Sequence, residues 1–393
     1  MSAALTFVAA LGLLSGVELD ARGFVAADGR VFAFAPGSPE QASGNAVSMV
    51  AEPQLALASD DGVHVVTVQP FLRLDPLDQQ RSHWDLRRAE YTATFESWEA
   101  GFGVGQFRWG VLESYGLTDV INQADYLESL DKSQRLGQPY LQVGWLPGDW
   151  AVRLYALPGS RPARFPGERG RLRLGAVVDP DQVIYESSLG QWQPSFALRV
   201  TGAVGDFDLG LGLFTGNARE PRLIAQLTED TLVAAYDVMH QASADVQWTL
   251  GALTLKAEGL ARLWSRELAF FWAGGVGLDY SFFDVAGSGV DVTLAAEYLH
   301  DTRPVTAPVT FFQHDVFAGL RLMVNDSAST LVQVGAIVDV LDGQTYARLQ
   351  AARRFGESWK LFGTVNAFVG PRGRLESTLL REHYAELRIV YYL

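Results

Sequence analysis

One segment of the chain is rich in carboxylates and is long enough to be a functional loop. In residues 110–137 the acidic side chains outnumber the two basic ones, which are Lys132 and Arg135. Loops of this length without regular structure are uncommon unless they are functional. We therefore expect this segment to line a site that handles ions or polar solutes. Its candidate side chains are Glu113, Asp119, Asn122 and Asp125, and Glu128 and Asp131 add to its acidic charge.

A second segment, residues 158–193, opens with a basic block. Arginine binds carboxylate or phosphate through two donors at once, so the block suits an anionic group. An acidic segment that faces a basic one would screen solutes by charge, as patches of charge do in pores. The two segments could equally pair with each other and only hold the fold, and the sequence leaves both interpretations open. The block contains Arg161, Arg164, Arg169, Arg171 and Arg173.

The histidines give no sign of catalysis. No histidine lies in a recognisable catalytic motif, and the chain has no cysteine, which excludes cysteine nucleophiles, thiolate metal sites and disulfides. We therefore expect neither an enzyme nor a cofactor or metal site. The histidines are His64, His83, His240, His300, His314 and His383.

The segments between the charged ones alternate in polarity. Near the end of the chain, Leu387, Ile389 and Tyr391 share one face of a strand, while Glu386 and Arg388 share the other. Successive side chains of a strand point to opposite faces, so each segment has one apolar and one mixed face. The segments run to about 10–13 residues, which exceeds the usual soluble strand and matches a tilted span of a bilayer. We predict an all-β fold, a transmembrane antiparallel β-barrel.

The connections between the predicted strands alternate between long and short. Short periplasmic turns and long outer loops are typical of bacterial outer-membrane barrels, which have an even number of strands. We predict about 18 strands, or 16 if residues 17–25 do not pair, with both chain termini in the periplasm. The long connections are expected at residues 26–46, 110–137, 158–193, 215–232, 300–311 and 370–380.

The composition excludes other classes of protein. A net charge of −14 argues against nucleic-acid binding, and 48% hydrophobic residues exclude disorder. An apolar run at residues 3–14 has the length of a signal-peptide core, so we interpret residues 1–16 as a signal-peptide remnant, with a first helix as the alternative. Residues 17–393 would then form a single barrel.

The mixed faces of the predicted strands supply cations to the lumen. A barrel of about 18 strands is too wide for side chains to fill and leaves an aqueous channel unless it is plugged. We expect residues 110–137 and 158–193 to fold inward and constrict that channel. The arginines that would join the constriction from the strands and their ends are Arg73, Arg88, Arg108, Arg153, Arg199 and Arg321.

Three short motifs resemble a family of uncharacterised proteobacterial outer-membrane barrels of porin type. They are Trp109-Gly110-Val111-Leu112-Glu113-Ser114, Asp119-Val120-Ile121-Asn122-Gln123-Ala124-Asp125 and Leu136-Gly137-Gln138-Pro139. The resemblance implies an outer-membrane barrel but no settled substrate. Tyr115-Gly116 departs from the family, where a His-Leu pair is more usual, and Leu393 replaces the usual terminal Phe.

These observations favour a bacterial outer-membrane channel through which small hydrophilic solutes, anionic ones among them, diffuse passively. The alternatives are an exporter or lipid-handling barrel that works with an inner-membrane or periplasmic partner, and a plugged structural barrel. The expected partners are outer-membrane lipid and lipopolysaccharide, the barrel-assembly machinery during biogenesis, and the solutes themselves. The sequence leaves monomer and homotrimer open.

Overall fold

The computed structural model describes residues 16–393 except for 227–230, 267–268, 311–312 and 372–378. Of the predicted signal-peptide remnant, all but Gly16 lies outside the described residues. Within the described ranges, no helix has the length and apolarity needed to cross a membrane.

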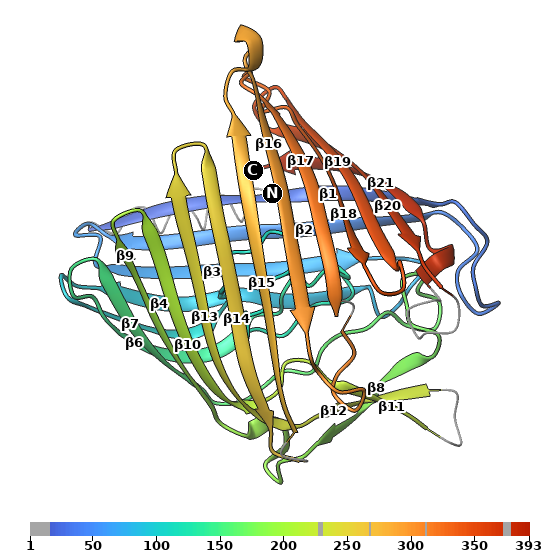
Figure 1. The fold of residues 1–393 in the computed structure, drawn as a ribbon, viewed down its shortest axis with the longest axis horizontal. Helices are drawn as coiled ribbons and strands as arrows, with labels where there is room; N and C mark the ends of the chain where they lie inside the picture. The colour runs from blue at the N-terminus through green and yellow to red at the C-terminus, as the bar shows by residue number, and fades with distance from the viewer. Residues whose placement is uncertain (1–15, 227–230, 267–268, 311–312, 372–378) are drawn as a thin grey trace.

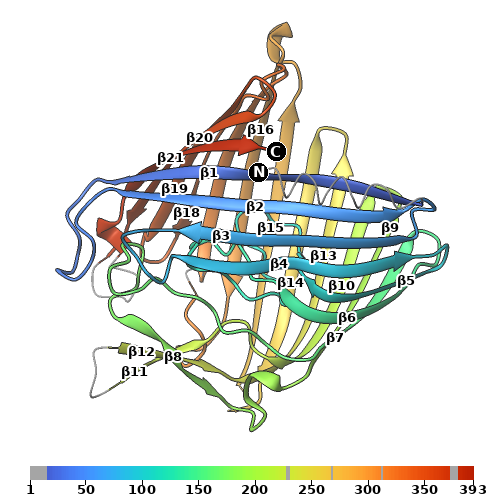
Figure 2. The same ribbon diagram turned by 180° about the vertical axis from the view of Figure 1, so that it is seen from behind.

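Eighteen strands form one closed antiparallel barrel, seen from opposite sides in Figures 1 and 2. Strands that follow each other around the barrel also follow each other in the sequence, and β21 (Tyr384–Tyr392) pairs with β1 (Val17–Phe32) to close the ring. This confirms the predicted barrel. The alternative of 16 strands is wrong, because β1 pairs on one edge with β2 and on the other with β21.

The remaining barrel strands have the following bounds. They are β2 (Ala46–Ser59), β3 (His64–Leu74), β4 (His83–Thr94), β5 (Trp98–Gly105), β6 (Gln138–Trp145), β7 (Trp150–Leu157), β9 (Ser195–Val204), β10 (Phe207–Asn217), β13 (Val238–Leu250), β14 (Leu253–Trp264), β15 (Ala269–Phe282), β16 (Val290–Asp301), β17 (His314–Val324), β18 (Leu331–Asp339), β19 (Thr345–Phe355) and β20 (Trp359–Val369).

A small sheet lies across one end of the barrel, where the long connections meet (Figure 1). It consists of β8 (Val177–Tyr185), β11 (Arg222–Ala225) and β12 (Thr231–Tyr236), and we call it the cap sheet. Strand β12 lies between the other two, antiparallel to β11 and parallel to β8. Two single-turn 3-10 helices, η1 (Gly190–Trp192) and η2 (Val285–Gly287), complete the described elements.

Two predicted boundaries were wrong. The connection expected at 26–46 begins only after Phe32, because β21 hydrogen-bonds the turn-like Asp28-Gly29 stretch as strand. The alternation of residues 233–250 by itself predicts a single strand, but β12 and β13 are separate strands that meet at Asp237. The first of them belongs to the cap sheet and only the second to the barrel, so periodicity alone could not separate them.

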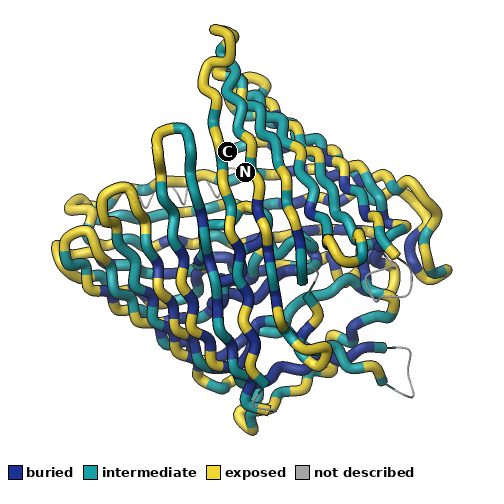
Figure 3. The backbone as a smooth tube through the Cα atoms, in the orientation of Figure 1, coloured by how far each residue is buried: buried dark blue, intermediate teal, exposed yellow. Residues whose placement is uncertain are grey.

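The period-two pattern survives in the burial of the strands, which alternates along the tube in Figure 3. On β14, Lys256, Glu258 and Arg262 are buried on the lumen side, while the intervening positions are only half buried. Leu141, Leu154 and many other large apolar side chains are exposed on the outer face. A face of exposed apolar residues is what lipid contact requires.

Glycine at position 103 of β5 allows the backbone to pass closely by β4. Its φ is +129°, and a Cβ there would lie 2.2 Å from the carbonyl oxygen of Ala89. Gly363 of β20 offers the opposite case, because a Cβ there would meet nothing within 4 Å.

We expect Gly103→Ala to destabilise the barrel by about 1–3 kcal/mol, the usual cost of a strained backbone position. The measurement is the temperature at which the purified barrel loses its folded mobility on a detergent gel. Gly363→Ala serves as the control and should leave that temperature unchanged. Equal effects of the two substitutions would contradict this explanation.

Candidate functional site

Residues 106–137 connect β5 to β6 through the interior of the barrel, and we call them the inward loop. Trp109, Val120 and Ile121 of this loop are buried in the largest apolar cluster, against side chains of the inner wall. The loop has no helix or strand of its own. Its buried backbone N–H groups therefore need partners from elsewhere in the molecule.

Glu258 on β14 supplies the first of these partners. Its carboxylate accepts hydrogen bonds from the backbone N–H groups of Val111 at 2.7 Å, Leu112 at 3.4 Å and Leu117 at 2.6 Å. Gly110 makes the approach possible, since its φ is +99° and a Cβ there would lie 2.4 Å from Glu258 Oε2. One carboxylate thus holds a whole turn of the loop.

Glu297 on β16 has the same role for the neighbouring residues of the loop. The backbone N–H groups of Glu113 and Ser114 donate to its two carboxylate oxygens at 2.6 and 3.0 Å. The Ser114 hydroxyl donates to it as well. Hydrogen bonds to a charged acceptor are stronger than those between neutral groups.

The second half of the inward loop is held by wall cations. Arg73 of β3 lies 2.6 Å from Glu128, and Arg87 of β4 lies 2.8 Å from Asp125. Burial acts to raise the pKa of Glu128, but the guanidinium of Arg73 holds that pKa below its ordinary value. The pKa of Asp125 is also lowered, since hydrogen bonding to His83 and the charge of Arg87 outweigh its burial.

Asn122 ties the two ends of the inward loop together. Its side-chain oxygen accepts from the N–H of Phe107 at 2.7 Å, and its amide nitrogen donates to the carbonyls of Gly105 and Leu136 at 2.8 and 2.9 Å. Asp119 pairs with Arg135 at 2.7 Å within the same loop. The structure therefore gives Asn122 and Asp119, both expected in the constriction, internal contacts of the loop.

Glu220 joins three segments beneath the cap sheet. It contacts Lys132 of the inward loop, Arg262 of β14 at 2.8 Å and Arg303 at 3.2 Å. These three cations outweigh the effect of burial and hold the pKa of Glu220 well below its ordinary value. The inward loop, the connection after β10 and the connection after β16 are thus fastened at one carboxylate.

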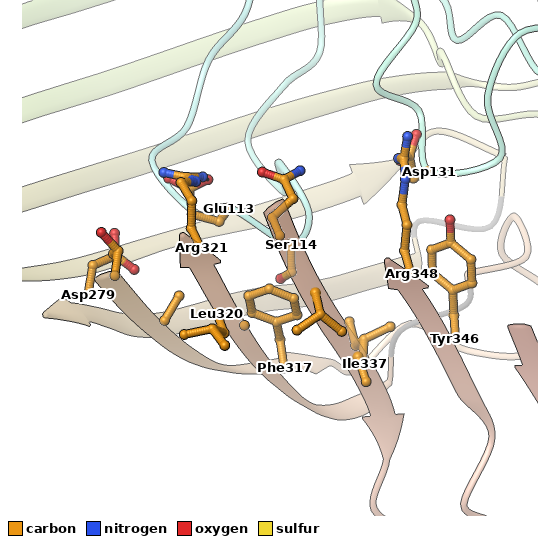
Figure 4. A pocket seen from close by; sticks show the side chains of 17 residues that line it. Glu113, Ser114, Asp131, Asp279, Phe317, Leu320, Arg321, Ile337, Tyr346 and Arg348 are labelled. Carbon is orange, nitrogen blue, oxygen red and sulfur yellow. The ribbon is translucent and has the colours of Figure 1, made fainter. Parts of the chain in front are cut away.

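A cavity of about 200 Å³ remains between the inward loop and the wall formed by β15 to β19 (Figure 4). Glu113 points from the loop toward Arg321 of β17, and their side chains lie 3.2 Å apart. Asp131 lies 3.1 Å from Arg348 of β19. These pairs are more exposed than the anchors of the loop, with 43% of the Arg321 side chain and 38% of the Arg348 side chain accessible.

Another ion pair and a second cavity lie beside these pairs. Lys256 of β14 pairs with Glu113 of the inward loop at 3.1 Å and with Asp279 of β15, so it connects the loop to the wall. A second cavity of about 70 Å³ shares Asp131, Ile337 and Tyr346 with the first. The two together follow the wall from the level of Arg321 toward the end of β19 nearer the long connections.

The basic block of residues 158–193 does not line this cavity. Arg161 lies 2.5 Å from Asp85, Arg171 lies 2.8 Å from Glu382, and Arg164 donates to the carbonyl of Trp84 at 2.9 Å. Arg173 donates to the carbonyl of Gly175 at 2.7 Å, while the Arg169 residue is exposed. The two charged segments therefore do not mainly pair with each other, because carboxylates and carbonyls of the barrel rim and other connections are nearer.

Of the cations expected in the constriction from the strands, only Arg321 lines the cavity. Arg73 is fully buried as an anchor of the inward loop. Arg88 pairs with Glu90 and Arg153 with Glu99 on the wall, and Arg199 pairs with Asp245 at 2.6 Å. Exposed Arg108 donates to the carbonyl of Ser133 at 3.2 Å.

Several site residues were missed by the sequence analysis. Arg348, Lys256 and Asp279 line the cavity or bridge it, and Glu258 and Glu297 hold the loop. All five lie on the mixed faces of alternating strands, which gave a signal that they point into the lumen. Nothing in the pattern could say which of the many lumen charges meet the loop.

Comparisons with known proteins identify the fold. No protein-family profile and no curated protein matches the sequence. Among solved structures, the chain is similar to a BenF-like porin from Pseudomonas fluorescens Pf-5, with a TM-score of 0.57, 11% identity and coverage of 96% of this chain and 98% of that one.

Two further solved structures have a similar fold. OccK3 (OpdO) of Pseudomonas aeruginosa gives a TM-score of 0.56 at 10% identity and covers 96% of both chains. Wzi of Escherichia coli, a carbohydrate-binding β-barrel involved in group 1 capsule assembly, gives a TM-score of 0.53 at 12% identity, with 93% of this chain and 83% of that one covered. The protein is an outer-membrane β-barrel. Its location is the bacterial outer membrane, its fold is of porin type, and the resemblance to the uncharacterised barrel family stays a prediction.

We expect Glu258→Ala to loosen the first half of the inward loop, because it removes three backbone hydrogen bonds to the carboxyl group, each worth about 1 kcal/mol. Hydrogen exchange of residues 110–118 should accelerate by at least about tenfold. Glu99→Ala is the matched control, since Glu99 is also a lumen carboxylate but contacts Arg153 and Gln142 of the wall. Unchanged exchange in Glu258→Ala would rule out the anchoring role.

The lowered pKa values of Asp125, Glu128 and Glu220 make a second prediction. A carboxylate whose pKa is depressed by folding contributes stability that is fully present above its unfolded value, about pH 4, and is lost as pH falls through the lowered value. Exchange of residues 124–132, corrected for its intrinsic rate, should therefore be the same at about pH 7 and pH 5 and rise only below about pH 4. A rise already at about pH 5 would show that these pairs do not hold the loop.

Proposed function

We propose that the protein is an outer-membrane channel for small hydrophilic solutes, with its narrowest point at the cavity between the inward loop and the wall of β15 to β19. The supporting observation is the pair of accessible ion pairs across this cavity, Glu113 with Arg321 and Asp131 with Arg348. Buried anchors hold a loop, whereas accessible charges on facing walls are in contact with what passes between them.

The distribution of charge at the cavity suits polar solutes that carry both signs or a negative group. The wall contributes the cations Arg321, Arg348 and Lys256 and one carboxylate, Asp279, and the loop contributes Glu113 and Asp131. The excess of cations on the wall and of carboxylates on the loop creates a field across the passage rather than along it. A solute with a carboxylate would turn that group toward the wall, where arginine offers two donors at once.

A second candidate function is a barrel that is closed at rest and acts with a periplasmic or inner-membrane partner. The observation that favours it is the extent of the filling, since the inward loop is anchored on β3, β4, β14 and β16 and the cap sheet lies over one end. Wzi, a carbohydrate-binding barrel, has a similar fold. In both candidates the short turns and the chain termini lie in the periplasm, and the protein is not an enzyme.

Recording from the purified protein in a planar bilayer separates the two candidates. We expect a steady current that is proportional to voltage, and steps in groups of three would indicate a homotrimer. No current without an added partner would overturn the open channel and favour the closed barrel.

The charge of the cavity can be tested in the same recording. Arg321→Gln together with Arg348→Gln should shift the reversal potential in asymmetric salt toward cations, by roughly a twofold change in permeability ratio. The matched control is Arg161→Gln together with Arg164→Gln, which removes the same charge outside the cavity and should leave the reversal potential unchanged. Equal shifts in both double variants would refute the placement of the constriction.

A further inference from the structure

Two lumen cations lack the carboxylate partner that the others have. Among the described residues, every Arg and Lys on a barrel strand has an Asp or Glu within 4.0 Å except Arg354 of β19 and Lys360 of β20. Both are half buried beside the turn that joins the two strands, and Arg354 donates to the backbone carbonyl of Glu357 at 2.9 Å, so neither charge is neutralised by a carboxylate.

Arg354 and Lys360 face the lumen side by side. They are directly opposite each other in the register of β19 and β20. Arg354 shares its face of β19 with Arg348, which lines the cavity between the inward loop and the wall. Like charges directly opposite each other on two strands repel and destabilise the pair.

A third cation and three aromatic rings complete the cluster. Arg388 of β21 lies 3.3 Å from Asp28, but Asp28 already accepts from Arg73 at 2.7 Å, so its charge is shared. The Arg354 guanidinium lies 5.6 Å from the ring centre of Tyr392, the Lys360 ammonium 5.0 Å from that of Phe362, and the Arg388 guanidinium 5.3 Å from that of Phe24. The ring faces hold the cations in place without neutralising them.

The position of the cluster places it beyond the cavity. Arg321, Gln333 and Gln350 form one row across β17, β18 and β19 at the level of the cavity. Arg354 lies four residues further along β19, toward the short turn that leads to β20, which corresponds to about 13 Å along the strand. On β4, β5 and β7, by contrast, Arg88 pairs with Glu90 and Arg153 pairs with Glu99, so these lumenal cations are neutralised.

We propose that Arg354, Lys360 and Arg388 form a lumenal binding site for the oxyanion group, carboxylate or phosphate, of a small solute. The two arginines provide planar pairs of donors and the lysine provides a compact positive charge. A bound oxyanion relieves the repulsion between Arg354 and Lys360. The site rests on the proposed function only in that solutes of the channel would pass it. Binding at equilibrium can be measured whether or not the barrel conducts.

Calorimetric titration of the detergent-purified barrel at low salt tests the site, with inorganic phosphate and succinate as probes. The wild type should bind at least one of them, and Arg354→Gln together with Lys360→Gln should weaken binding by at least about tenfold. Arg353→Gln is the matched control, because Arg353 is the neighbouring residue but points away from the lumen and pairs with Asp326. Arg354→Lys together with Lys360→Arg keeps both charges and should retain binding.

The outcomes separate this site from the channel. Absence of binding of both probes to the wild type, or equal affinities in the double glutamine variant and in Arg353→Gln, would overturn the site. If the double glutamine variant does not fold, binding to the wild type must still weaken steeply as chloride is added, and salt-independent binding would overturn the site. Binding to a barrel that is silent in a bilayer would support the site and overturn only the channel.

Discussion

The structure depends on one constraint, the need of a buried irregular backbone for hydrogen-bond partners. A barrel wall satisfies its own N–H and C=O groups by closing on itself. The inward loop has no such solution, because it enters the lumen without helix or strand. Carboxylates of the wall take the place of a neighbouring strand, with Glu258 accepting from three backbone N–H groups and Glu297 from two.

The position of the cavity follows from where the loop is fastened. The anchors on β14 and β16 fix its first half, and those on β3 and β4 fix its second half. The described ion pairs between the loop and the wall of β17 to β19 are the accessible pairs of Arg321 and Arg348. Space is therefore left on the side where the loop is held by the fewest buried contacts.

The fold could be predicted from the sequence because its cause is local. Lipid on one face and a polar lumen on the other impose a period of two on every strand, and that period can be read without knowing which strands are neighbours. The candidate site could be predicted only incompletely. Glu113 and Arg321 were expected in it, but Asp131 meets Arg348 across 217 positions, and no local pattern encodes such a pairing.

The basic block also shows that sequence patterns do not reveal which charged residues pair. Arg161 and Arg171 looked like filter residues because they are close together in the sequence, yet they pair with Asp85 of β4 and with Glu382 of the connection before β21. A guanidinium in a crowded rim takes the nearest carboxylate, and which one is nearest is decided by the closed ring.

The pairing of β21 with β1 also has a consequence for biogenesis. The strands that anchor the inward loop, β3, β4, β14 and β16, all precede β17 in the sequence, whereas the facing wall with Arg321, Arg348, Lys360 and Arg388 consists of the last strands. The loop can therefore be in place on an open sheet, but β1 and β21 meet only when the final strand pairs with the first. Closure of the wall and formation of the lumenal pairs Arg388–Asp28 and Arg30–Glu386 are the same event.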